Sequence, residues 1–176
     1  MANTFELIAS STVGSGGAAN IDFTSIASTW TDLVLKVSGR STASFTRRTM
    51  RVTINNSVTA SDYADRYLLG SGSAASSSAD AAGSQSYIVA WDLPAATGTA
   101  NTFANIEIYI PNYASTSAYK SLSIDGVGEE NGTTAYMGLV AGIYNQNTAI
   151  SRITVAPDSG NFAQYSTAYL YGVNNA

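Results

Sequence analysis

Residues 104–111, "ANIEIYIP", decide the fold class of this chain. Apolar residues stand at every second position, with Asn, Glu and Tyr between them, until Pro111 ends the pattern. This spacing is typical of a β-strand with one buried face and one exposed face. Pro111 has no N–H to donate to a sheet, so it suits the end of a strand.

The same period recurs along the chain, with Gly, Asn, Ser and Pro between the runs and no long helical pattern. We therefore predict an all-β fold: an antiparallel β-sandwich of the jelly-roll type, with about eight to eleven strands and a single domain over residues 1–176. The expected strands are 5–10, 19–23, 32–38, 49–55, 63–69, 87–93, 102–110, 120–127, 135–145, 151–156 and 166–173.

Two connecting segments carry their own signals. Asn131-Gly132 lies between two strand patterns and predicts a two-residue hairpin turn in which both residues take positive φ. Residues 70–86, "GSGSAASSSADAAGSQS", contain no large apolar side chain and predict a flexible surface loop. The alternative for this segment is that it becomes ordered against a neighbouring protein.

The composition excludes several kinds of chemistry. The 176 residues include no Cys and no His, which removes thiol nucleophiles, imidazole bases and the usual transition-metal ligands. The net charge of −4 argues against nucleic acid and anionic membranes as partners, although Arg47, Arg48 and Arg51 cluster. We expect no enzyme activity, no catalytic residues, no metal and no cofactor.

The acidic residues leave alternatives open. Asp62 and Asp65 are either a carboxylate pair of the kind that glycoside hydrolases use, or a strand-entry residue and a surface charge, which is the interpretation we favour. Glu129 and Glu130 are expected to be solvated, and a calcium site with Asp125 is the less favoured alternative.

Tyrosine is abundant, with eleven in the chain. Tyr165, Tyr169 and Tyr171 share one side of the last strand pattern, while Ala168 and Leu170 share the other. Such tyrosines either bridge the core and water or form an aromatic face that binds sugar or a protein neighbour.

Five segments together resemble a family of known proteins: "FELIASSTV", "WTDLVLKVSGRS", "NTFANIEIYIPNY", "KSLSIDGVGEENGTTAY" and "SGNFAQYSTAYLYGV". They are similar to small β-rich virion structural proteins of tailed bacteriophages, of the aquatic and cyanobacterial phage group, which are usually described as virion or tail-fibre-like proteins. The resemblance covers nearly the whole chain from Phe5 to Val173. It implies a place on the phage particle after assembly in the bacterial host cytoplasm, and it carries no catalytic residues.

The first functional hypothesis is a capsid decoration or cement protein, most simply a homotrimer, that clamps the major capsid protein on the outer head surface. The first alternative is a receptor-binding or tail-fibre tip module that binds a host saccharide; the second is a free carbohydrate-binding module or hydrolase unrelated to phage. The candidate interface residues are Asn3, Thr4, Phe5, Ser73, Ser77 and Tyr113, the last taken as an exposed tyrosine.

Overall fold

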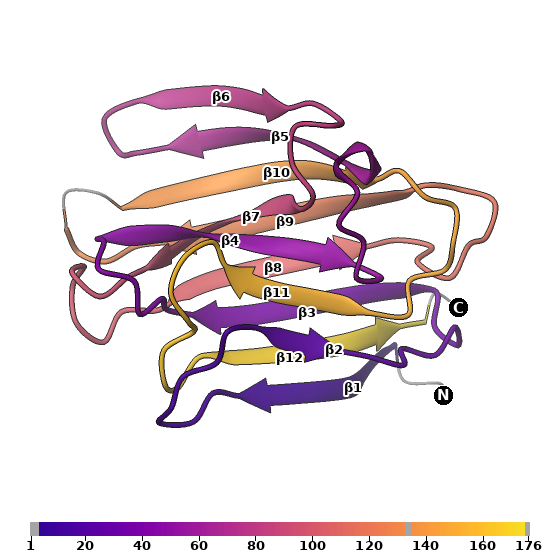
Figure 1. The fold of residues 1–176 in the computed structure, drawn as a ribbon, viewed down its shortest axis with the longest axis horizontal. Helices are drawn as coiled ribbons and strands as arrows, with labels where there is room; N and C mark the ends of the chain where they lie inside the picture. The colour runs from indigo at the N-terminus through magenta and orange to yellow at the C-terminus, as the bar shows by residue number, and fades with distance from the viewer. Residues whose placement is uncertain (1–3, 133–134, 175–176) are drawn as a thin grey trace.

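A computed structural model describes residues 4–132 and 135–174 of the chain. These residues form β-strands, one short 3-10 turn, η1 (Ala60–Asp62), and no α-helix (Figure 1). The strands are β1 (Phe5–Thr12), β2 (Ile21–Phe23), β3 (Asp32–Gly39), β4 (Arg47–Ile54), β5 (Tyr63–Gly70), β6 (Ala75–Asp80), β7 (Ile88–Pro94), β8 (Ala104–Ile110), β9 (Lys120–Gly128), β10 (Tyr136–Tyr144), β11 (Ile153–Pro157) and β12 (Thr167–Val173).

The strands form two antiparallel sheets that pack face to face. The larger sheet has eight strands in the order β1-β12-β3-β8-β9-β10-β5-β6, and the smaller has four in the order β2-β11-β4-β7. The pairs β1–β12, β2–β11, β3–β8 and β4–β7 are nested in sequence and alternate between the sheets, which is the pattern of a long hairpin rolled into a jelly roll. The strands β9, β10, β5 and β6 extend one side of the larger sheet (Figure 1).

The core lies between the sheets and contains the apolar faces that the period-2 pattern predicts. Ile106, Ile108 and Ile110 of β8 are 0 to 1% exposed, and Met50, Val52 and Ile54 of β4 are fully buried. The prediction of an all-β sandwich and of which side of these strands faces inward is therefore confirmed.

Strand β10 departs from the usual arrangement because Met137, Leu139 and Ile143 face solvent, while Val140 and Tyr144 on its inner face are buried. Its inner face carries Gly138, and a Cβ at that position would overlap the ring of Trp91 from β7. A Cβ at Gly126 of the neighbouring β9 would meet the same side chain. Trp91 itself has a positive φ of 87°, which aims its indole across β9 and β10. The glycines thus make room for one large ring that fills this part of the core.

Two predictions about connecting segments are wrong. Within the segment predicted to be a flexible loop, residues 75–80 form β6, which brings the described part of the chain to twelve strands. The strand forms because its backbone pairs with β5 over Asp65–Gly70, which needs no apolar side chain. The predicted two-residue turn is also absent, since residues 129–135 connect β9 to β10, and Asn131 has a φ of 54° while Gly132 lies outside the left-handed region.

Candidate functional site

The outer face of the larger sheet exposes a group of large apolar side chains. Leu68 of β5 and Leu139 of β10 are directly opposed, and so are Met137 of β10 and Val127 of β9. We define these four together with Ile143, further along β10, as the outer strip; their exposed fractions run from 36% to 59%. Monomeric proteins seldom leave neighbouring large apolar residues exposed on one face, so this face is a candidate interaction surface.

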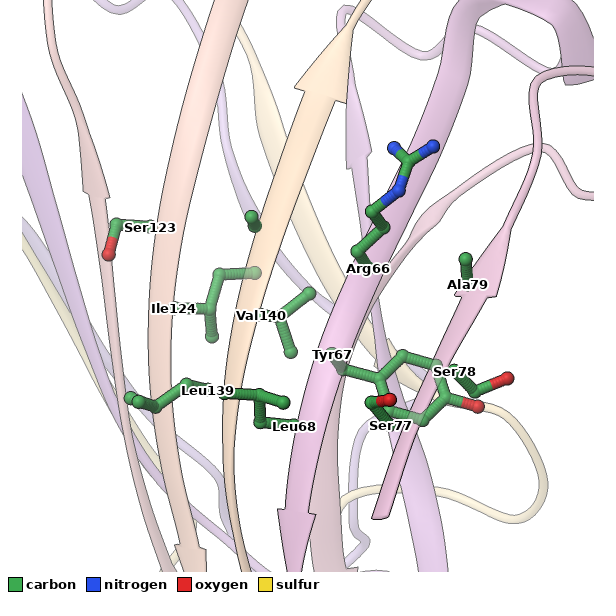
Figure 2. Close-up of a pocket in the computed structure, with 11 residues that line it drawn as sticks. Arg66, Tyr67, Leu68, Ser77, Ser78, Ala79, Ser123, Ile124, Leu139 and Val140 are labelled. Atoms are coloured by element: carbon green, nitrogen blue, oxygen red, sulfur yellow. The ribbon is translucent and has the colours of Figure 1, made fainter.

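A shallow groove adjoins the outer strip, with a volume of about 690 Å³. Figure 2 shows the side chains around it, including Leu68, Leu139 and Arg66 and the shorter Ser77 and Ala79 of β6. The groove exists because β6 presents only small side chains beside the larger ones of β5 and β10. It is open and mostly apolar, which suits an apolar side chain from a partner.

The structure separates the predicted interface residues into two groups. Thr4 and Phe5 lie at the start of β1, and Ser73 and Ser77 lie on or next to β6; all four are exposed. β1 and β6 are the two opposite edges of the larger sheet (Figure 1). Asn3 lies outside the described residues.

Tyr113 does not belong to any exposed surface, so its prediction as a contact residue is wrong. Its side chain is fully buried. Its hydroxyl donates a hydrogen bond to the Ala27 carbonyl oxygen and accepts one from the Trp30 N–H at 3.4 Å. Asn112, with a φ of 50°, redirects the chain just before this residue, which the sequence pattern does not reveal.

The alternation of the last strand is confirmed. Tyr169 is 38% exposed and Tyr171 is half-buried, while Ala168 and Leu170 are fully buried in the core. Tyr109 of β8 is also 37% exposed, and its hydroxyl donates a hydrogen bond to Asp32 at 2.7 Å. Val34 of β3 is opposite Tyr171 on one neighbouring strand and Tyr109 on the other. These two rings flank it, which explains why it is buried on the outer face.

Asp65 was predicted to be a surface charge but is only 2% exposed. One carboxylate oxygen accepts hydrogen bonds from the Val89 N–H at 2.9 Å and the Gln85 amide at 3.2 Å. Burial raises the pKa of Asp65 to about 6. The Val89 hydrogen bond opposes this rise, and the negative charge of Asp80, opposite Asp65 on β6, adds to it.

The remaining acidic residues of interest also have structural partners. Asp62 accepts hydrogen bonds from Ser57 at 2.5 Å and from Gln146 at 2.7 Å. Glu130 was predicted to be solvated but is 3% exposed, and it accepts a hydrogen bond from the Thr99 N–H at 3.3 Å. Within residues 4–132 and 135–174 no three acidic side chains come together in a way that could hold a metal ion.

The arginine cluster of the sequence is internally paired on the smaller sheet. Arg47 forms an ion pair with Asp92 and lies over the Tyr136 ring. Arg48 forms an ion pair with Asp158, and Arg51 lies 4.5 Å from the centre of the Tyr87 ring. These contacts neutralise or cover the basic groups, so the cluster is not a free cationic surface.

Comparison with known proteins identifies no family. No family model matches the chain, and no curated protein matches it. Among solved structures it is similar to CG-16, a homodimeric agglutinin from chicken liver, with a TM-score of 0.34 and 11% identity over 84% of this chain and 97% of that chain. It is also similar to an engineered GH43 glycoside hydrolase with endo-xylanase and exo-arabinofuranosidase activity, with a TM-score of 0.37 and 12% identity over 98% of this chain and 36% of that one. TM-scores this low carry no argument about function. In the described part of the chain, no helix has the length and apolar character needed to cross a membrane.

Proposed function

We propose that this chain is a structural protein of a bacteriophage particle: a capsid decoration or cement protein that sits on the outer head surface as a homotrimer. The observation that carries the proposal is the outer strip, where large apolar residues of β5, β9 and β10 lie together in water. Because the five sequence segments resemble phage virion proteins, we infer that this surface acts on a phage particle.

The outer strip suits binding to another protein. Fully burying an exposed Leu or Met side chain contributes roughly 1.5–3 kcal/mol, so covering Leu68, Met137 and Leu139, which are 51–59% exposed, contributes roughly half of this for each side chain. A flat sheet face presents these side chains at fixed spacing, so a matching surface on the major capsid protein can cover them together. If the chain binds the assembled shell and not the free capsid subunit, it stabilises the shell by mass action.

The test uses purified particles of the phage that encodes the chain. Labelling the chain and imaging the particles is expected to place it on the head. Particles stripped of the chain are expected to rebind it, and particles assembled without it are expected to release DNA at a lower temperature or a milder osmotic shock. A label confined to the tail, or a failure to rebind stripped heads, contradicts the cement proposal.

A tail-tip module that binds a host saccharide is the second candidate. It is favoured by the outward-facing tyrosines Tyr109, Tyr169 and Tyr171, since aromatic rings on a sheet face can stack on sugar rings. In this case the label lies on the tail, and the purified chain binds host surface glycan. Substitution of Tyr169 by Ala then weakens glycan binding while the protein remains folded.

A further inference from the structure

The larger sheet ends in two edges that no other described strand covers. β1 forms one edge and pairs only with β12, and β6 forms the other and pairs only with β5 (Figure 1). Unpaired edges present backbone N–H and C=O groups that readily pair with another strand. β6 has the sequence "ASSSAD", without the Pro, Lys or bulge that commonly protects an edge.

Residues of β6 alternately form hydrogen bonds to β5 and face away from it, and this alternation identifies which backbone groups point outward. The Ser71 N–H donates to the Ala74 carbonyl at 3.0 Å, which closes the β5–β6 hairpin. In an antiparallel pair, residues alternate between bonding inward and facing away. Because Ser76 and Ser78 follow Ala74 at even spacing, they bond to β5, whereas Ala75, Ser77 and Ala79 direct their N–H and C=O groups to the free edge.

The backbone groups of β1 alternate in the same way. The Asn174 N–H donates to the Thr4 carbonyl at 3.0 Å, which makes Thr4 an inward-bonding position. Phe5 is opposite Val173, whose carbonyl accepts instead from Thr31 at 2.9 Å on the other side of β12. Phe5 and Leu7 therefore direct their backbone groups to the free edge. A bulge between Leu7 and Ala9 limits regular pairing to this first half of β1.

The side chains of the two edges are complementary in size. Phe5 and Leu7 are 54% and 52% exposed, and Leu7 is opposite Tyr171 on the outer face. On β6 the outer face carries Ser77 and Ala79, opposite Leu68 and Arg66, and these small residues border the groove. One edge thus presents large apolar side chains, and the other provides the space for them.

We propose that β1 of a second copy of this chain pairs antiparallel with β6, with Leu7 of that copy opposite Ser77 and Phe5 opposite Ala79. In this register both positions are hydrogen-bonded pairs, and their side chains share the outer face, so Phe5 and Leu7 of the second copy enter the groove beside Leu68. The contact is head-to-tail because it joins two different edges, and repetition about an axis closes a ring. The inference rests on the self-association in the proposed function and names its contact.

The chain has no native Cys, so single-cysteine variants test the contact directly. Hydrogen-bonded antiparallel neighbours have Cα atoms about 5.5 Å apart, within the range that a disulfide spans. A mixture of Leu7→Cys and Ser77→Cys proteins, mildly oxidised, is expected to form a disulfide-linked species that neither variant forms alone. Leu7→Cys mixed with Ser121→Cys, an exposed position on β9 in the middle of the larger sheet, is the matched control and is expected to form none.

A second pair of variants tests the contact without a cross-link. Ser77→Pro removes an outward N–H and leaves the bonds of Ser76 and Ser78 to β5 in place. Its mass by light scattering is expected to fall to that of one chain, 18.3 kDa, while Ser77→Ala keeps the oligomer. A far-UV spectrum unchanged from the parent protein shows that the proline variant is folded.

The inference is overturned if the parent protein is monomeric at high concentration, or if it is oligomeric but the mixed cross-link does not form. It is also overturned if Ser77→Cys alone forms a disulfide dimer, which indicates that β6 pairs with β6. These results are distinguishable from failure of the proposed function. If the mixed cross-link forms but the protein does not rebind stripped heads, the result supports the strand pairing and contradicts the cement function.

Discussion

Leu68 of β5 and Leu139 of β10 lie directly opposite each other on the outer face of the larger sheet, 59% and 51% exposed. Cross-strand apolar pairs normally contribute to stability by packing in the core. Here both side chains retain much of their contact with water, and covering them with a partner releases that water. This relationship makes the outer strip the first place to test for binding.

Leu139→Lys is expected to weaken binding to stripped phage heads by roughly tenfold, because about 1 kcal/mol of apolar burial is lost and a charge must be desolvated. The free energy of unfolding should change by no more than about 0.5 kcal/mol, since the position is exposed. Co-sedimentation with stripped heads measures the first quantity and urea unfolding the second. Val58→Lys, at an 82% exposed position outside the outer strip, is the control that should bind normally.

Gly138→Ala is expected to lower the free energy of unfolding by on the order of 1–3 kcal/mol, because its new methyl group overlaps the Trp91 ring and the core must shift. Gly14→Ala has no heavy atom within 4 Å of the added Cβ and is the matched control. Urea denaturation of both variants measures the difference. Equal stability of the two variants would show that Trp91 moves aside freely.

The stability of the protein is expected to fall as pH rises through the titration of Asp65. Its pKa is about 6 in the folded protein against a usual 3.8, so between these values the unfolded chain ionises while the folded protein keeps its proton. The difference between the two pKa values corresponds to a decrease in the free energy of unfolding of up to roughly 3 kcal/mol between pH 4 and pH 8. Denaturant unfolding across this range is expected to show a smaller loss for Asp65→Asn. A variant with the parent's full pH dependence excludes Asp65 as the source, and Asp125→Asn serves as an exposed control.

Asn131→Val is expected to lower the melting temperature, because it forces a β-branched side chain to a φ of 54° at a cost of about 1–2 kcal/mol. Asn131→Gly should be at least as stable as the parent, since glycine adopts this conformation without strain. Differential scanning calorimetry distinguishes the two. Gly132→Val should show a smaller loss, because Gly132 lies outside the left-handed region and its added Cβ meets a carboxylate oxygen of Glu130 at 3.2 Å, a contact that a small shift of that side chain relieves.

Most of the fold could be predicted from local pattern. Runs such as "ANIEIYI" alternate with period two, and each of the eleven expected strands coincides with an observed strand to within a few residues. β6 could not be predicted, because Ala and Ser carry no periodic apolar signal and the strand depends on backbone pairing with β5. The burial of Tyr113 and Asp65 also depends on contacts with residues distant in sequence, with Ala27 in one case and Val89 in the other.

Local pattern is enough to specify a β-sandwich with polar loops, since alternation along each strand decides which side chains can be buried together. Which face of β10 is buried depends on long-range packing. Its Met137 and Leu139 face outward because Trp91 of the opposite sheet fills the inner space and requires glycine beneath it. Only the tertiary structure placed Phe5 and Ser77 on opposite free edges of one sheet, because strand order is fixed by long-range pairing and not by local pattern.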